Sequence, residues 1–148
     1  MQWLILPIAF STWMAVPLGH AIARGVPDEI RHNRSRFATA IDAFAILALA
    51  ASIGAAFAWW GGAIAAALAL LVRLLARTRW SVMVIGALAL GVAGASDGTM
   101  IATIATLLLV PNLLRGALAR DWRETVSGTA VQPIGAVLVT AVISLTLA

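Results

Sequence analysis

The stretch AIAAALALLVRLLARTRWSVMVIGALALGVAGA, residues 63–95, decides how this chain folds. It places Arg73, Arg77 and Arg79 between two short apolar segments. If these segments entered a membrane as a re-entrant hairpin, the arginines would lie near the bilayer midplane, where each costs roughly 2.5–3.5 kcal/mol. A complete crossing avoids that cost, because Arg73 can extend its charge to the interface. We therefore expect residues 63–76 and 80–95 to cross the membrane completely, although spans usually need about 17–25 residues.

The arrangement of arginines between apolar segments recurs along the whole chain. All ten basic residues are arginines, and any two successive clusters are separated by two apolar stretches with a turn between them. Loops on the inner side of a membrane carry the excess of basic residues, so all three clusters are expected on that side. The clusters are Arg24, Arg31, Arg34 and Arg36; then Arg73, Arg77 and Arg79; then Arg115, Arg120 and Arg123.

This pattern predicts an all-α integral membrane protein that forms a bundle of about six transmembrane helices. We expect one transmembrane domain over residues 1–148, in the inner membrane, with the N- and C-termini both outside. The glycine pair 61–62 and the sequence Ser-Asp-Gly at 96–98 are turn signals on the outer side. The predicted spans are residues 3–19, 37–60, 63–76, 80–95, 99–118 and 126–148.

Composition supports a lipid environment. The chain of 148 residues is 62% hydrophobic and 11% charged, with a mean hydropathy of +1.00, whereas soluble domains are about 25% charged. The net charge of +4 would suggest nucleic acid in a soluble protein. Here the arginines flank apolar spans, so we expect the lipid bilayer as a partner and no nucleic acid. The absence of cysteine excludes disulfides and thiolate chemistry, and we expect no cofactor and no metal.

The order of the spans suggests an internal symmetry. Three spans precede the central arginine cluster and three follow it, so the two halves would have opposite orientations, as in many small transporters. Asp42 opens the second span and Asp97 opens the fifth, at positions that would correspond under such a 3+3 inverted repeat. Three unrelated helical hairpins would give the same order of spans.

Asp42 is the strongest candidate for a functional side chain. It lies six residues beyond Arg36, which is roughly 9 Å along a helix, and an apolar run follows it. Ionisable residues within spans usually face a bundle interior or a water-filled cavity. Alternatively, Asp42 lies at the inner interface, where the helix dipole and a nearby arginine stabilise its charge.

Further polar residues fall within the predicted spans. Asp97 is either a helix N-cap or an outer cation or proton site. The others are expected to line a pathway together with Asp42. We expect Asp42, Asn112 and Gln132 to form one inner cluster. We also expect helix breaks at Pro111 and Pro133, since each proline leaves a carbonyl without its helical partner. The alternative is that these residues form helix–helix seams. This set comprises Thr103, Thr106, Asn112 and Gln132.

These features predict a small multi-pass secondary transporter or exporter of a small solute or cation, with Asp42 as the coupling or binding carboxylate. The alternative is a non-catalytic accessory subunit of a larger membrane complex. A stable homo-oligomer would favour the transporter, and a stoichiometric partner subunit would favour the accessory role. A lipid-processing enzyme is a weaker third possibility, because the sequence contains no recognisable catalytic constellation.

Overall fold

The computed structural model describes residues 5–76, 79–96, 98–127 and 129–146, and within these ranges all regular structure is helical, as predicted. In chain order the helices are α1 (Ile5–Ala23), α2 (Pro27–His32), α3 (Arg34–Ala56), α4 (Trp59–Leu75), α5 (Arg79–Ala95), α6 (Gly98–Leu118), α7 (Trp122–Ser127) and α8 (Val131–Thr146). Two of them, α2 and α7, are short helices that the sequence analysis placed in loops.

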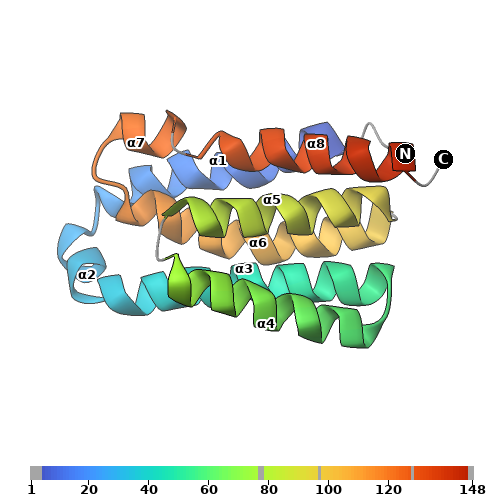
Figure 1. Ribbon diagram of the computed structural model, residues 1–148. Helices are drawn as coiled ribbons and strands as arrows, with labels where there is room; N and C mark the ends of the chain where they lie inside the picture. Colours follow the sequence, from blue (N-terminus) through green and yellow to red (C-terminus); the bar gives the residue numbers. More distant parts are fainter. Residues whose placement is uncertain (1–4, 77–78, 97, 128, 147–148) are drawn as a thin grey trace.

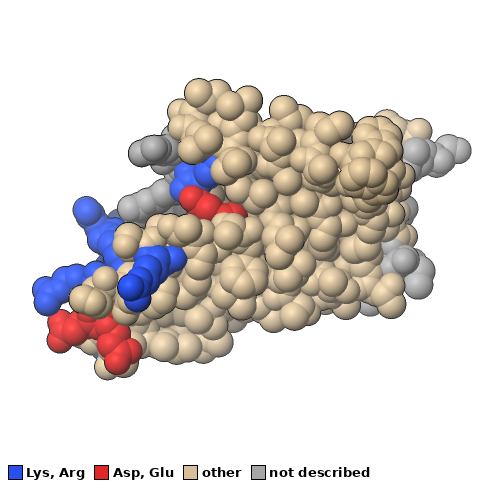
Figure 2. Space-filling view, turned by 90° about the horizontal axis from the view of Figure 1, so that it is seen from below, with Lys and Arg blue, Asp and Glu red and all other residues tan. Residues whose placement is uncertain are grey.

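The six longer helices run back and forth along a common direction (Figure 1). The short helices α2 and α7, the last turn of α4 and the first turn of α5 lie at one end of the bundle (Figure 1). We call it the arginine end, because described arginines of all three clusters belong to these segments or lie near them in the sequence. α1 begins and α8 ends at the opposite end. Figure 2 shows basic and acidic side chains gathered toward one end of the face in view, whereas the rest of that face is uncharged.

Among the described residues, three helices are long and apolar enough to cross a membrane, namely α1, α3 and α6. The helices Trp59–Leu75 and Val131–Thr146 and the segment Ser81–Ala95 of α5 are apolar but shorter. Many large apolar side chains on the outside of the bundle are exposed, including Leu68 and Leu75 of α4. A chain of this composition cannot bury all of its apolar surface internally, and the exposed remainder fits a membrane protein.

Helices α1 and α6 approach each other until their backbones touch. A β-carbon at Gly19 of α1 would collide with the carbonyl oxygen of Leu113 on α6, and one at Gly116 would collide with the carbonyl oxygen of Val16 on α1. Small residues permit such close contact, and van der Waals packing at such contacts is one of the forces that associate helices in lipid. The two reciprocal glycines therefore fix how α1 and α6 cross near the arginine end.

The glycine pair 61–62 does not form the turn that the sequence analysis assigned to it. α3 ends at Ala56 and α4 begins at Trp59, so both glycines lie in the first turn of α4. No described residue has a positive φ angle, so this turn does not require glycine. A β-carbon at Gly62 would instead lie 2.5 Å from the carbonyl oxygen of Ala50 and 3.0 Å from the Cα atom of Gly54. Gly62 therefore serves the close contact between α3 and α4, whereas a β-carbon at Gly61 would make only ordinary contacts.

The packing of the last helix in each half differs, which counts against the inverted repeat. α4 packs along α3, the middle helix of its half, whereas α8 packs along α5, the first helix of its half. On α5, a β-carbon at Gly91 would lie 2.5 Å from the Cβ atom of Val139. The hydroxyl of Thr140 on α8 also donates a hydrogen bond of 3.1 Å to the Gly91 carbonyl. α8 is thus held on α5 by contacts that have no counterpart between α4 and α1 among the packed helix pairs.

Candidate functional site

A cavity of about 370 Å³ opens between the helices at the arginine end. Its volume falls at the small end of the range of about 300–1,000 Å³ that is usual for ligand pockets. The described residues that line it come from α1, α3, α4, α5, α6 and α7 and from the segments that follow α6 and α7. They are Val16, Arg34, Ala38, Ile41, Asp42, Arg73, Val82, Met83, Arg115, Leu118, Ala119, Thr125 and Thr129.

An ion pair forms one side of this cavity. The Nε atom of Arg73 on α4 donates to Oδ1 of Asp42 on α3 at 2.7 Å, and Nη1 of Arg73 donates to the hydroxyl of Ser81 on α5 at 3.3 Å. The side chains of Arg73 and Asp42 are 20% and 27% exposed, so the pair is only partly buried. Arg73 thereby connects three helices at a position that remains open to the cavity.

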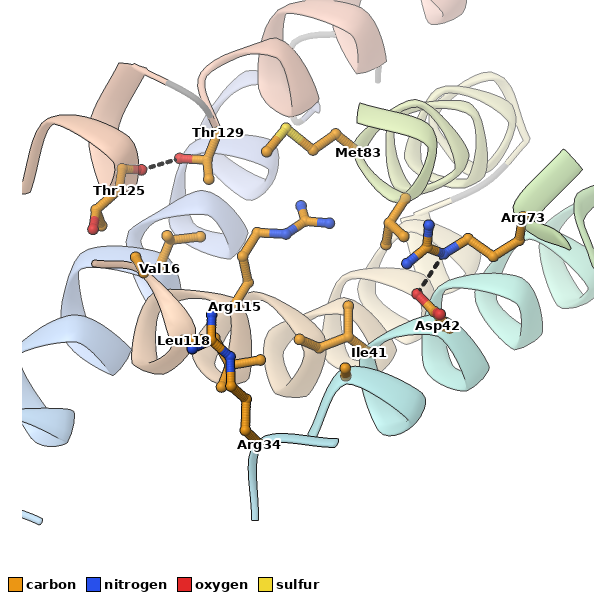
Figure 3. Close-up of a pocket in the computed structure, with 13 residues that line it drawn as sticks. Val16, Arg34, Ile41, Asp42, Arg73, Met83, Arg115, Leu118, Thr125 and Thr129 are labelled. Carbon is orange, nitrogen blue, oxygen red and sulfur yellow. Dashed lines mark hydrogen bonds and ion pairs between the residues drawn. The ribbon is translucent and has the colours of Figure 1, made fainter. Parts of the chain in front are cut away.

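Arg115 enters the cavity from α6 without a partner. Its side chain extends from the helix into the interior of the cavity, whose other sides carry Met83 and the Arg73–Asp42 pair (Figure 3). It is partly buried, and within the described part of the chain it makes no hydrogen bond or ion pair. The charge of Arg73 repels it and the charge of Asp42 attracts it. Asp42 is the one carboxylate of the described lining that offsets the charge of Arg115, and Arg73 shares it. Partial burial of the Arg115 guanidinium therefore costs free energy unless another group compensates its charge.

Arg34 adds a third positive charge to the cavity. It begins α3, its side chain is exposed, and Figure 3 shows it on the Leu118 side of the cavity. Among the described lining residues, three guanidinium groups therefore stand against one carboxylate. The cavity has a net positive charge on these residues, which favours an anion over a cation.

Hydroxyl groups line the side of the cavity next to α7. The indole Nε1 of Trp13 donates to Oγ1 of Thr129 at 2.8 Å, and the Thr129 hydroxyl donates to the carbonyl oxygen of Thr125. The Thr125 hydroxyl donates in turn to the carbonyl oxygen of Asp121 at 2.8 Å. Trp13 holds Thr129 in place by this bond, so the connection between α7 and α8 is tied to α1.

The expected inner cluster of Asp42, Asn112 and Gln132 does not form around this cavity, because only Asp42 lines it. Asn112 of α6 is 2% exposed, and its Nδ2 donates to the carbonyl oxygen of Thr12 on α1 at 3.0 Å. Gln132 is also 2% exposed and lies against Gly86 of α5, where a β-carbon would come within 3.2 Å of its Nε2. Both amides occupy helix–helix contacts.

Two of the predicted pathway residues, Thr103 and Thr106 of α6, face away from the cavity. Thr103 and Thr106 are exposed, and their hydroxyls donate to the carbonyl oxygens of Thr99 and Ala102 one turn earlier in the same helix. Their spacing does put them on one face, but that face points outward. Asp97, the other predicted site residue of this region, lies outside the described residues.

The predicted helix breaks at Pro111 and Pro133 are absent. α6 continues through Pro111, which is buried. α8 begins at Val131, so Pro133 lies in its first turn. A backbone N–H at this position has no acceptor within the helix, so a proline there breaks no helical hydrogen bond. The carbonyl oxygen of Thr129, which Pro133 was expected to leave free, accepts a hydrogen bond of 3.1 Å from the backbone N–H of Gln132.

The sequence analysis missed most of the cavity because it assigned the arginines to topology alone. Arg73 and Arg115 fall inside the predicted spans 63–76 and 99–118, and an ionisable residue within a span is itself a signal of function. His20 of α1 is buried, with 6% of its surface exposed. Both of its ring nitrogens lack a hydrogen-bond partner among the described atoms, and its ring stacks obliquely on Trp122 at 5.9 Å between centroids.

The site has no metal-binding character within the described ranges, which contain no group of three histidine, cysteine or acidic residues that could hold an ion. Comparison with protein-family models, with curated proteins and with solved structures finds no match to this chain. What the site does must therefore be argued from its geometry.

Proposed function

We propose that this protein is a small multi-pass membrane transporter that binds its solute in the cavity at the arginine end. The observation that carries this proposal is the cavity of about 370 Å³ with charged walls. It lies among helices of which α1, α3 and α6 are apolar enough to cross a membrane. Ionisable side chains at such a position are expensive and usually mark a substrate or ion pathway.

The proposal includes a topology with six spans in the inner membrane, in which the arginine end faces the inside and both termini lie outside. The excess of arginine at one end supports this orientation. The shorter helices α4, α5 and α8 would cross where the protein thins the bilayer or where flanking arginines extend to the interface, at a modest cost per Å of mismatch.

Within this proposal, Asp42 remains the coupling or binding carboxylate, but it acts through its ion pair. Because Arg73 contacts Asp42 on α3 and Ser81 on α5, a solute that competes for Arg73 would weaken the attachment of α4 to both neighbours. A ligand can shift a conformational equilibrium only by binding one state better than the other. The exchange of partners at Arg73 supplies that difference.

Transport by purified protein in liposomes tests the proposal. Uptake would be measured for a panel of labelled inorganic anions, carboxylates, amino acids and cations. Asp42→Asn should abolish flux while the variant still purifies as a folded, monodisperse protein. Asp28→Asn is the matched control, since Asp28 is 91% exposed and pairs with Arg31 outside the cavity. Wild-type flux in Asp42→Asn would overturn the assignment of Asp42.

A second candidate function is that of an accessory subunit in a larger membrane complex. The exposed face of α4 favours it, because this helix packs mainly on α3 and leaves a row of apolar side chains uncovered. Purification from the native membrane in mild detergent separates the two functions. A stoichiometric partner would favour the subunit, and a stable homo-oligomer would favour the transporter. The row consists of Ile64, Leu68, Leu71 and Leu75.

A further inference from the structure

We propose that the ligand of the cavity is an oxyanion, a phosphate or carboxylate group, which Arg115 and Arg73 bind together. This inference rests on the proposed function in that it takes the cavity as a ligand site, and it adds the chemical class of the ligand. It does not require that the ligand be transported.

The first argument is the state of Arg115. Its guanidinium lies in the cavity, is partly buried and has no hydrogen-bond or ion-pair partner among the described residues. Arginine presents several N–H donors in a rigid planar fork that matches the two oxygens of a carboxylate or phosphate. An unused fork that points into a cavity is matched by an oxyanion better than by a neutral or cationic solute.

The second argument is the balance of charge. Arg73 and Arg115 act on each other repulsively, and Asp42 is the one carboxylate among the described residues that line the cavity. Asp42 is already engaged with Arg73 at 2.7 Å. A bound oxyanion would neutralise the positive charge of the arginines that Asp42 does not compensate. The attraction would be strong, because unlike charges lie a few Å apart in a region of low effective dielectric.

The third argument is that Asp42 resembles the proposed ligand. Its carboxylate occupies Arg73 as an incoming oxyanion would, so Asp42 acts as an internal competitor that the ligand displaces. The hydroxyl of Ser81, at 3.3 Å from Nη1 of Arg73, stays beside the guanidinium during this exchange. Arg34 at the cavity margin is exposed and attracts anions to the opening by its charge.

Two sources could supply this chemistry, a free anion from the inner compartment or the headgroup of an anionic lipid. The experiment uses the full chain in an uncharged maltoside detergent. Calorimetric titration with inorganic phosphate and with succinate measures free anions. Native mass spectrometry after exposure to phosphatidylglycerol, with phosphatidylcholine as the reference, measures retained lipid.

Four variants read out the site. Arg115→Gln should weaken oxyanion binding by about 10- to 100-fold, since hydrogen bonds to charged groups are among the strong ones. Arg115→Lys keeps the charge without the fork and should fall between Arg115→Gln and the wild type. Asp42→Asn should tighten binding by roughly 10-fold because the internal competitor loses its charge. Arg31→Gln, which removes an arginine charge that is 85% exposed and paired with Asp28, should leave binding unchanged.

Each outcome either supports the oxyanion proposal or overturns it. Binding of phosphate or succinate that is lost in Arg115→Gln supports the proposal with a free anion as ligand. Selective retention of phosphatidylglycerol that is lost in the same variant supports it with a lipid headgroup. If Arg115→Gln does not fold, the tightening in Asp42→Asn carries the test, and unchanged or weaker binding there overturns the proposal. Equal weakening in Arg115→Gln and Arg31→Gln, or no binding of any oxyanion, also overturns it.

The failure of this inference is distinguishable from failure of the proposed function. Oxyanion binding without flux in liposomes would support the oxyanion site and contradict the proposed transport function. Flux of a neutral or cationic solute without oxyanion binding would support the transport function and contradict an oxyanion as the ligand.

Discussion

The Nε atom of Arg73 lies 2.7 Å from Oδ1 of Asp42, and this contact joins α4 to α3 at the arginine end of the bundle. At the opposite end the same two helices meet at Gly62, where a β-carbon would lie 3.0 Å from the Cα atom of Gly54. One end is thus held by an interaction that a ligand can replace, and the other by close packing that a ligand cannot reach. α4 is therefore best placed to move at the arginine end about a fixed opposite end.

The first prediction concerns the strength of the Arg73–Asp42 pair. Asp42→Asn and Arg73→Gln should each lower the free energy of unfolding in detergent by roughly 1–3 kcal/mol, because each removes one member of a partly buried ion pair. The double variant should recover part of that loss, giving an interaction energy of about 1–2 kcal/mol in a double-mutant cycle. Thermal or denaturant unfolding measures it.

Arg31→Gln is the control for this prediction. It removes an ion pair whose side chains are 85% and 91% exposed, and such pairs contribute about 0–1 kcal/mol. Additive effects of Asp42→Asn and Arg73→Gln would show that the two side chains do not interact in the folded protein.

The second prediction concerns the crossing of α1 and α6. Gly116→Ala places a methyl group against the carbonyl oxygen of Val16, and a backbone atom cannot rotate away as a side chain would. Overpacking typically lowers the free energy of unfolding by about 1–3 kcal/mol. We expect Gly116→Ala to lower it by the upper value or more, with loss of monodisperse protein. Gly61→Ala is the matched control, because its β-carbon would meet the Ile53 side chain at 3.6 Å, an ordinary contact. Equal stability of both variants would contradict the packing described for α1 and α6.

The third prediction separates structural polar residues from those of the cavity. Asn112→Ala removes the 3.0 Å hydrogen bond to the Thr12 carbonyl and should lower stability by about 0.6–2 kcal/mol, the range for hydrogen bonds between helices in membranes. Because Asn112 does not line the cavity, oxyanion affinity and flux per folded molecule should stay at wild-type values. A loss of affinity without a loss of stability would return Asn112 to the binding site.

The sequence predicts the helices well where apolar runs meet arginines and poorly where packing decides. The six longer helices follow the six apolar stretches, since within lipid a continuous apolar segment satisfies its own backbone hydrogen bonds by forming a helix. α2 was missed even though Pro27 opens it, Asp28 and Glu29 occupy its first turn and Arg31 its last, all of which favour a short helix. The turn at residues 57–58 was misplaced because glycine was assigned to turn formation, whereas Gly62 is needed for contact.

The candidate site was only partly predictable for a related reason. The charge of Asp42 in an apolar span left two placements open, the inside of the bundle and the inner interface. Its partner could not be predicted, because alanine-rich helix faces resemble one another. The structure pairs Asp42 with Arg73 because α4 packs on α3. Asn112 and Gln132 were grouped with Asp42 by depth alone, and depth does not say which neighbour a side chain faces.

The last prediction tests the proposed orientation, and the absence of cysteine makes it direct. A single cysteine introduced by Ser35→Cys lies at the arginine end in the exposed first turn of α3, and one introduced by Phe57→Cys lies at the opposite end, where Phe57 is 69% exposed. In intact cells, a maleimide that cannot cross membranes should label Phe57→Cys and should label Ser35→Cys only after the membrane is permeabilised. The physical reason for this expectation is the arginine excess, because loops that are rich in arginine favour the inner side of a membrane. Labelling of both positions in intact cells would contradict a spanning α3, and the reversed pattern would place the cavity, and any ligand it binds, on the outer face.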